Sequence, residues 1–531
     1  MTNRNRVSRT SVILLAIFAL ILASSFHLRA AADDSIVVQT TSGQLRGVPR
    51  SGGGARFLGV PYARPPIGDL RWHEPLPAKP WSGVRDASTF SAPCAQPILG
   101  DWNRHDAESG SEDCLYLNVV TPQWPVKKPL PVMFWIHGGG NEGGSGIGDL
   151  YNSGTLVNHG VLLVTINYRL GIFGFFAHPA LTRQSPHHAS GNYGLMDQIL
   201  ALRWVRDNIA NFGGDPHNIT VFGQSAGAMD TGMLMASLAR DLFQKAIAES
   251  GSPFSPPLAT LAEAEKNGET LASDLKAPSG DAAIASLRKL SAQDLLAALA
   301  NLPRSPRPRV GPDVDGWVLQ RLPAQVFAAG QESPIPLIFG TTAREFGGAA
   351  SPDELRAMIQ HAAGDSAPQA LATYGLANGG TGTTDPKYGT ASDQWPADVA
   401  FRCPATAQGI WHTAARHPAY EYELDHPIPG QENAVHSSDL PYVFGFFPKS
   451  GNIAGNFSDT DTKLADLVET YFTNFAKTGD PNSPNVPPWP KFGSSQSYIQ
   501  FMPDGSVVPA TALRSAQCTV LREFLSGQPK Q

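Results

Sequence analysis

The sequence predicts an α/β fold with a central, mainly parallel sheet flanked by helices. Three observations lead to this prediction. Segments 131–136 and 161–168 are continuously apolar, which is typical of strands buried on both faces of a parallel sheet. Segment 195–211 has apolar residues at helical spacing. The apolar segment 219–222 then runs into a Gly-x-Ser-x-Gly turn that can start a helix.

Further segments continue this alternation along the chain. We expect strands within 35–46, 245–250, 335–340 and 420–424, and helices within 260–302, 351–364, 461–478 and 515–525. Segment 303–309 is rich in Pro and segment 375–395 in Gly, Thr and Asp, so both are expected to be irregular. Because no linker divides the sequence, we expect one domain over 33–531 with large inserted helices and loops.

The first 32 residues have the features of a secretory signal peptide. Arg4, Arg6 and Arg9 precede an apolar run of about 16 residues, and Ala30-Ala31-Ala32 offers a cleavage site. A membrane anchor is the alternative, but a spanning helix needs ~20 residues. We therefore expect a secreted or periplasmic protein whose mature chain has no membrane span.

Charge and cysteine content narrow the function classes. The formal net charge is −6, and loss of the arginines in 1–32 would make it more negative, which disfavours nucleic acid as a partner. The oligomeric state is not indicated. Four cysteines in an exported chain predict two disulfides. Three pairings are possible, and sequence proximity favours Cys94 with Cys114, which leaves Cys403 with Cys518.

Ser225, in the Gly-x-Ser-x-Gly turn, is the candidate nucleophile. The turn from strand to helix is so tight that only small residues fit at Gly223 and Gly227. A serine hydroxyl is barely ionised at neutral pH, so it needs an imidazole to take its proton. The alternative is a glycine-rich turn whose serine has no catalytic role. The other motifs of the chain decide between these two interpretations.

A histidine and an acid follow Ser225 in the order that this chemistry uses. His436 lies in a loop after a predicted strand, and His426 at a strand end is the alternative base. Glu345 lies in the loop after 335–340, where a carboxylate could hold the imidazole tautomer. The alternative for either histidine is a surface position without a catalytic role, and the alternative for Glu345 is a solvated loop glutamate.

The run His137-Gly138-Gly139-Gly140 directly follows an apolar strand. Glycine N–H groups can approach a developing oxyanion without obstruction by a Cβ atom. We therefore expect N–H groups of this glycine run, together with the N–H of Ala226, to form an oxyanion hole. A flexible glycine turn is the alternative.

Longer blocks resemble the type-B carboxylesterase/lipase family, which contains cholinesterases, liver-type carboxylesterases and bacterial and fungal relatives. The resemblance covers nearly all of 35–525 and is carried by blocks at 59–66, 112–118, 167–171, 191–198, 211–216 and 474–482. It implies an α/β-hydrolase fold and a secreted serine carboxylesterase of small-molecule esters that needs no metal or cofactor. For the site, it implies the triad Ser225, Glu345 and His436, the oxyanion donors Gly139, Gly140 and Ala226, a supporting Ser250, and the disulfides Cys94–Cys114 and Cys403–Cys518.

The sequence departs from this family at two places. Gln224 precedes the candidate nucleophile where the family usually has Glu, and segment 347–350 is Gly-Gly-Ala-Ala where cholinesterases carry aromatic residues. Both departures remove parts of a cation-binding gorge and argue against a choline ester. Trp102 is a candidate gorge residue, with a rim or packing role as the alternative.

Arg304, Arg307 and Arg309 are interleaved with prolines in a segment that borders the acyl pocket in the resembled family. Guanidinium groups bind carboxylates with forked geometry. We therefore hypothesise an esterase for anionic polycarboxylate esters, such as fumonisin-type tricarballylates. A solvated basic loop is the alternative.

Three other functions compete with the esterase reading. A non-catalytic, cholinesterase-like adhesion domain would lack the serine, which this chain keeps. A lipase with a lid needs an apolar flap, and the loop 94–114 is too polar to suggest one. A serine peptidase stays possible, because a triad alone does not distinguish esters from amides.

Overall fold

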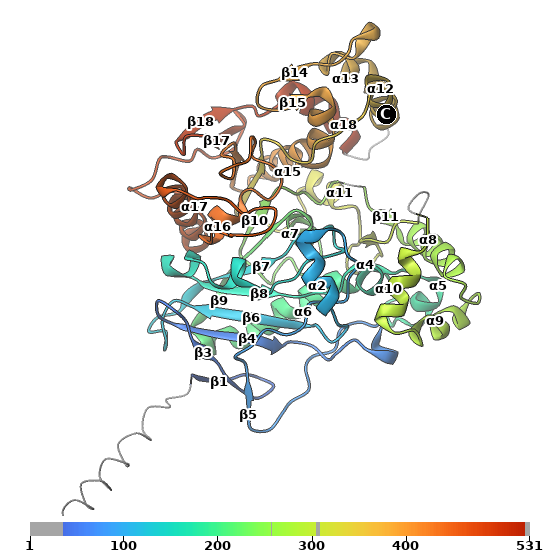
Figure 1. Ribbon diagram of the computed structural model, residues 1–531, viewed down its shortest axis with the longest axis vertical. Coiled ribbons are helices and arrows are strands. Elements are labelled where there is room, and N and C mark those ends of the chain that lie inside the picture. Colours follow the sequence, from blue (N-terminus) through green and yellow to red (C-terminus); the bar gives the residue numbers. More distant parts are fainter. Residues whose placement is uncertain (1–35, 256, 304–307, 526–531) are drawn as a thin grey trace, which may run out of the picture.

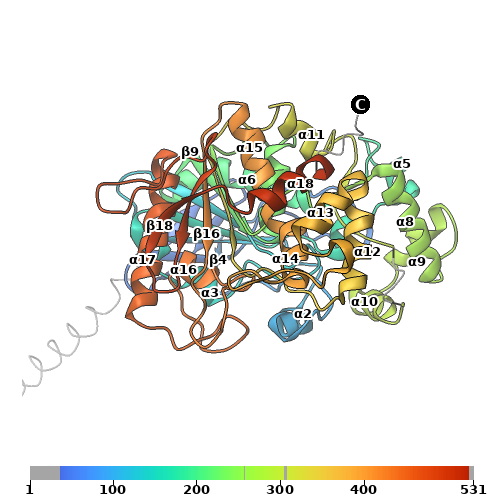
Figure 2. The same cartoon turned by 90° about the horizontal axis from the view of Figure 1, so that it is seen from above.

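The computed structural model describes residues 36–255, 257–303 and 308–525, so the predicted signal peptide lies outside the described residues. One 11-stranded sheet runs through the molecule, and helices pack on both of its faces (Figure 1, Figure 2). From edge to edge its strands are Val507–Thr511 (β18), Ser497–Phe501 (β17), Ala419–Leu424 (β16), Leu337–Thr342 (β13), Lys245–Glu249 (β10), Gly214–Gln224 (β9), Leu130–Ile136 (β7), Leu162–Ile166 (β8), Tyr116–Thr121 (β6), Ala55–Pro61 (β4) and Val48–Pro49 (β3).

The strands from β17 to β8 in this order run parallel, and the strands at both edges are antiparallel. The predicted α/β fold with a mainly parallel sheet is therefore confirmed. All parallel strands end at one edge of the sheet, and loops that leave this edge can meet there.

Continuous apolarity of the central strands follows from burial of both faces. On β7, Val132 and Phe134 point into one core cluster, whereas Met133 and Trp135 point into the other. The first face is covered by Tyr193–Asn208 (α6), Ala226–Met235 (α7) and Cys403–Ala414 (α15). The second face is covered by Leu440–Phe444 (α16) and Asp459–Thr478 (α17).

Two groups of helices lie outside this framework. Segment 261–300 forms Leu261–Asp274 (α8), Asp281–Arg288 (α9) and Ala292–Ala300 (α10), which project at one side of the molecule (Figure 1). Pro352–Ala363 (α12), Ala367–Thr373 (α13) and Ser515–Leu525 (α18) gather together, as the view from above shows (Figure 2). The disulfide Cys403–Cys518 joins α15 to α18.

Shorter elements complete the described chain. The strands are Val37–Gln39 (β1), Gln44–Arg46 (β2), Val84–Asp86 (β5), Ala259–Thr260 (β11), Asp313–Val314 (β12), Thr384–Asp385 (β14) and Gly389–Thr390 (β15). The helices are Arg104–Ser109 (α2), Asp149–Asn152 (α3), Gly171–Phe175 (α4), Pro179–Gln184 (α5), Pro323–Ala328 (α11) and Ala391–Ala397 (α14). The single-turn helices are Gly68–Leu70 (η1), Asp101–Asn103 (η2), Leu156–His159 (η3), Ile209–Phe212 (η4), Gly364–Ser366 (η5) and Ala377–Gly379 (η6), and Asp398–Arg402 (η7) is a π-helical turn.

The prediction of loop over 375–395 is wrong at its end, where α14 begins at Ala391. Thr390 caps this helix by accepting from the Asp393 N–H, while the Asp393 side chain accepts from the Thr390 N–H. Threonine and aspartate favour loops by composition, but in this order they make a helix start. Within the described residues, no helix has both the length and the apolarity to cross a membrane.

Candidate active site

The turn that follows β9 has the strained geometry predicted from the sequence. Ser225 has φ 58° and ψ −123°, and its N–H donates to the Glu249 carbonyl at 2.8 Å. A Cβ atom on Gly227 would lie 2.0 Å from the Ile136 carbonyl oxygen, and one on Gly223 would lie 2.5 Å from Gly227. Glycine is therefore required on both sides of Ser225, and α7 starts immediately after it.

Glu345 and His436 meet across two neighbouring parallel strands. Glu345 follows β13 and His436 follows β16, and the Arg344 N–H ties the two loops together by donating to the Ala434 carbonyl at 2.9 Å. His436 Nδ1 is hydrogen-bonded to Glu345 Oε2, and the Thr342 N–H donates to Glu345 Oε1 at 2.8 Å. This geometry fixes the proton of a neutral imidazole on Nδ1 and leaves the lone pair on Nε2.

Electrostatics keep Glu345 ionised. Burial alone would raise the pKa of its carboxyl group, but His436, Ser250 and the Thr342 N–H together hold that pKa below its ordinary value. Ser250 is completely buried at the end of β10. The structure thus brings together Glu345, His436 and the proposed supporting Ser250.

The free edge of the imidazole faces the turn that carries Ser225. The Gln224 amide Nε2 lies 3.2 Å from His436 Nε2, so it donates to the imidazole lone pair. Phe346 and Phe401 both contact the ring, with centroid distances of 4.3 and 4.9 Å and tilted planes, and the two phenyl rings also contact each other at 5.7 Å. His436 is therefore held by two aromatic side chains and by contacts at both of its nitrogens.

The glycine loop after β7 lies against Ser225. A Cβ atom on Gly138 would lie 3.0 Å from the Ser225 Cβ, and both Gly139 (φ 111°) and Gly140 (φ 69°) need positive φ. Within the described ranges, the N–H groups of Gly139, Gly140 and Ala226 donate to no group of the protein. Three unpaired donors beside a serine can stabilise an oxyanion.

A buried hydrogen-bond network that sequence reasoning missed supports this loop. Asn141 Nδ2 donates to Asp230 Oδ1 at 2.9 Å, and Gln198 Nε2 donates to Asp230 Oδ2 at 2.5 Å. The Tyr168 hydroxyl donates to Asn141 Oδ1 at 2.9 Å, and its ring stacks on His137. Burial raises the pKa of Asp230 to about 7 and lowers the pKa of His137 to about 4. Tyr168 and Gln198 lie in blocks that resemble the family, but no local pattern in the sequence marks Asn141 or Asp230 as their partners.

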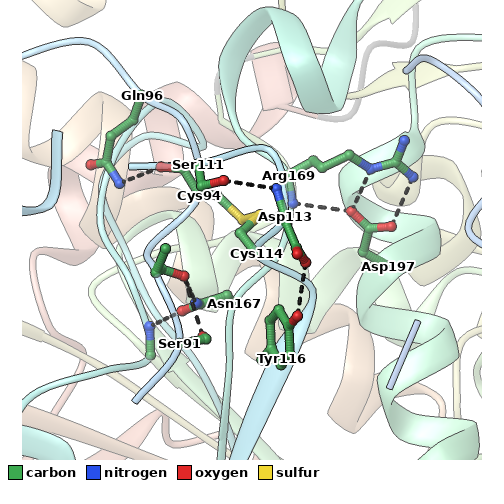
Figure 3. The surroundings of a disulfide bond; sticks show 12 residues. Ser91, Cys94, Gln96, Ser111, Asp113, Cys114, Tyr116, Asn167, Arg169 and Asp197 are labelled. Carbon is green, nitrogen blue, oxygen red and sulfur yellow. Dashed lines mark hydrogen bonds and ion pairs between the residues drawn. A yellow bond between two sulfur atoms is a disulfide. The ribbon is translucent and has the colours of Figure 1, made fainter. Parts of the chain in front are cut away.

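The Cys94–Cys114 disulfide closes the loop that carries Gln96 (Figure 3). Gln96 exchanges two hydrogen bonds with the Gly144 backbone, at 2.8 and 2.9 Å, and so joins the two loops. The ring of Trp102 lies against Gly139 and is 49% exposed. Trp102 therefore lies at the rim of the site beside the oxyanion loop, and both predicted disulfides are confirmed.

Of the three clustered arginines, Arg304 and Arg307 lie outside the described residues. Arg309 lines two adjoining cavities of about 500 and 310 Å³, and Glu142 lines the smaller one together with Leu170 and Phe173. Desolvation lowers the pKa of Arg309, and the Glu142 carboxylate opposes this change. Glu142 is only two residues beyond Gly140, so Arg309 lies near the glycine loop.

His426, the alternative base, has a different environment. Its Nε2 is 3.0 Å from Asp461 Oδ1, and Asp461 also caps the start of α17. This histidine fastens β16 to the helix that covers the second face of the sheet. Among the described residues it has no contact with Ser225 or Glu345.

Comparisons with known proteins agree with this geometry. A family model described as "Carboxylesterase family" matches residues 34–520. The chain is 37% identical over 502 residues to "Fumonisin B1 esterase" of Sphingopyxis macrogoltabida, covering 90% of this chain and 89% of that protein. It is 35% identical over 487 residues to human "Cocaine esterase", covering 84% and 83%. A solved structure of "PNB esterase" matches with a TM-score of 0.77 and 32% identity, over 91% of this chain and 99% of that one.

Proposed function

The chain belongs to the carboxylesterase family, and we propose that it hydrolyses carboxylic esters through Ser225, His436 and Glu345. The family model and the relatives named as esterases make it a carboxylic ester hydrolase, and the presence of Ser225 argues against a non-catalytic adhesion domain. The hydrogen bond between His436 Nδ1 and Glu345 Oε2, on loops beside the strained Ser225 turn, carries the assignment of the residues.

In the proposed reaction, Ser225 Oγ attacks the ester carbonyl carbon while His436 Nε2 takes the hydroxyl proton. The carbonyl oxygen becomes an oxyanion that accepts from the N–H groups of Gly139, Gly140 and Ala226. Collapse breaks the bond to the alcohol oxygen, which receives the proton from His436. Water then adds to the acyl-enzyme by the same proton transfers and releases the acid.

Ionised Glu345 orients the imidazole and stabilises the imidazolium that forms in each step. The Gln224 amide donates to Nε2 of His436, so it must release that lone pair for His436 to take the Ser225 proton. The contacts of Phe346 and Phe401 with the imidazole restrict its rotation. Gln224 is a positioning residue, because it acts through His436.

Hydrolysis of p-nitrophenyl butyrate by triad variants tests this assignment. Ser225→Ala and His436→Ala should lower kcat/KM at least ~10⁴-fold, and Glu345→Gln about 10³- to 10⁴-fold. His426→Gln is the matched control and should stay within a few-fold of wild type. If His426→Gln abolished turnover while folded His436→Ala retained it, the base would be misassigned.

A second candidate function concerns the acyl group. We propose that the site accepts esters whose acyl part carries free carboxylates, as hypothesised from the arginine segment. Two observations favour it: the relative named Fumonisin B1 esterase, and Arg309 in the wall of the cavity that Glu142 also lines. A guanidinium–carboxylate hydrogen bond contributes about 1.5–3 kcal/mol, which corresponds to roughly a 10- to 100-fold preference.

Two esters with one leaving group, a butyryl and a succinyl ester, measure this preference. Arg309→Gln should lower the succinyl-to-butyryl ratio of kcat/KM about 10-fold or more. Glu142→Gln should raise the ratio, because it removes a carboxylate that competes for Arg309. Arg206→Gln, on the exposed side of α6, is the control for a general charge effect. If the succinyl-to-butyryl ratio of kcat/KM were unchanged in both site variants, Arg309 would not bind the acyl group, and the protein would be an esterase of broad specificity.

We also propose export, supported by the two disulfides and by the N-terminal sequence. N-terminal sequencing of the native protein should give a start near residue 33. A retained Met1 in the cellular fraction would contradict cleavage.

A further inference from the structure

Three side chains with metal-ligating atoms converge away from the candidate active site. Glu332 lies in the loop between α11 and β13, His412 lies near the end of α15, and His417 follows that helix. The His417 N–H donates to the His412 carbonyl at 3.2 Å, which brings the two imidazoles to a centroid distance of 4.9 Å. One ligand atom from each side chain lies within 4.8 Å of the others.

Hydrogen bonding at His412 requires a proton or a metal ion between Nδ1 and Glu332. Its Nε2 is 2.8 Å from the Ile335 carbonyl oxygen, which can only accept, so Nε2 carries the hydrogen. Its Nδ1 is 2.8 Å from Glu332 Oε1. In a neutral imidazole this Nδ1 is a lone pair that faces a carboxylate oxygen. Two acceptors cannot face each other in a buried site unless a proton or a metal ion lies between them.

Glu332 adds a second, independent observation. Its Oε1 also faces His417 Nδ1 at 3.1 Å, whereas its Oε2 is buried without a hydrogen-bond partner in the described parts of the chain. Glu332 is 3% exposed, so its carboxylate is removed from water. A buried carboxylate with one unused oxygen and two imidazoles is a set of ligands that divalent transition metals prefer.

We propose that Glu332, His412 and His417 bind a divalent transition-metal ion and that Zn²⁺ is the preferred metal. His412 Nδ1, His417 Nδ1 and the Glu332 carboxylate would be the protein ligands, and the metal would replace the proton between them. The bond from His412 Nε2–H to Ile335 is the outer contact that orients a metal-bound imidazole. Water can supply a fourth ligand from the side of His417, whose side chain is 17% exposed.

Binding requires a small opening of the cluster. Tetrahedral zinc with bonds of about 2.0–2.1 Å separates its ligand atoms by about 3.3 Å, somewhat more than the 2.8 and 3.1 Å of the protonated cluster. Both distances end at Glu332 Oε1, so a shift of the Glu332 carboxylate by a few tenths of an ångström away from the two imidazoles makes this room. The ligands must also lose protons, so affinity rises with pH.

The position of the cluster points to a structural role. Ile335 precedes β13, whereas Glu345 follows it, so the metal site and the triad lie at opposite ends of this strand. A metal ion would fasten the loop 329–335 to α15. We therefore expect it to raise the thermal stability and to leave ester hydrolysis unchanged.

Equilibrium dialysis of the EDTA-treated full chain against ZnCl₂ at pH 8 tests the proposal. We expect one Zn²⁺ bound per chain, a Tm several degrees higher, and release of the metal at pH 5. Co²⁺ should give the visible absorption of a tetrahedral N/O site. The cysteines of the described chain are all in disulfides, so thiols there do not compete for metal.

His417→Gln should abolish the stoichiometric binding and the Tm increase, and its partly exposed position makes it the variant most tolerant of folding. His361→Gln, on the exposed side of α12, is the matched control and should bind like wild type. If wild type binds no Zn²⁺, or if His417→Gln binds as well as wild type, the cluster is a protonated ion pair and the proposal is overturned.

Discussion

Gln224 determines the charge around the proposed base. Where an amide donates to His436 Nε2, a carboxylate at the same position would instead attract the imidazolium form. The departure from the usual Glu could be read from the sequence, but its contact with His436 could not.

The first prediction replaces Gln224 with glutamate. A carboxylate about 3 Å from His436 Nε2 should move the acid limb of the kcat/KM profile upward by about 1 pH unit or more, because an opposite charge favours the protonated imidazole. Gln224→Met, which has similar size and no charge, should lower kcat without moving the limb. A Gln224→Glu profile that superimposes on the wild-type profile would refute the contact.

The second prediction concerns Asp230 beneath the oxyanion loop. Burial raises the pKa of this carboxyl group from its ordinary value to about 7. The folded protein therefore holds a proton that the unfolded chain releases near pH 4, so this group loses stabilising effect as pH rises from about 4 to 7. Asp230→Asn removes that dependence, and Gln198 can reverse its amide, because Gln198 Oε1 has no partner among the described residues.

Urea unfolding at pH 5 and pH 8 measures this effect. Relative to wild type, Asp230→Asn should be more stable at pH 8 than at pH 5: the difference between their free energies of unfolding should shift in favour of the variant by roughly 2 kcal/mol. Asp207→Asn, at an exposed site on α6, is the control. Parallel stability profiles for wild type and Asp230→Asn would show that this carboxyl ionises normally.

Among single residues, the sequence predicted those that belong to a motif and missed those that only support one. Ser225 and Gly139 are marked by glycine patterns with a steric cause. Asn141, Asp230 and Tyr168 are not, because their roles depend on contacts between segments far apart in the chain. Arg309 could be identified as unusual, whereas its neighbour Glu142 required the fold.

At the scale of elements, apolar continuity predicted the central strands because both faces of the sheet are covered. Helix starts have a local signal where a capping side chain is present, as at Ser291, whose side chain accepts from the Asp294 N–H. The start of α14 was missed, because composition outweighed the Thr390–Asp393 cap. The α2 helix inside the Cys94–Cys114 loop was not foreseen either, since its residues are polar.

The third prediction compares the two disulfides. Cys403–Cys518 closes a loop with a sequence separation of 115, and Cys94–Cys114 one of 20. Chain entropy makes the longer closure more stabilising by about 1.5 kcal/mol. Urea unfolding of Cys403→Ser/Cys518→Ser and Cys94→Ser/Cys114→Ser should reproduce that order. An equal or reversed order would show that native contacts outweigh loop closure.

For the whole molecule, the sheet order brings distant segments to one edge. Ser225 follows β9, Glu345 follows β13 and His436 follows β16, and these parallel strands share the sheet with only β10 between β9 and β13. The order of motifs in the sequence predicted this meeting in outline. The distances, the aromatic walls around His436 and the metal-ligand cluster at the opposite end could not be predicted, because they depend on packing.

The most direct test of the proposed triad is covalent labelling with a fluorophosphonate, read by intact mass and peptide mapping. We expect one label per chain on the peptide that contains Ser225, no label on Ser225→Ala, and labelling slowed at least ~10³-fold in folded Glu345→Gln. A label on another serine, or equal labelling rates in wild type and Glu345→Gln, would contradict the assignment of Ser225, His436 and Glu345.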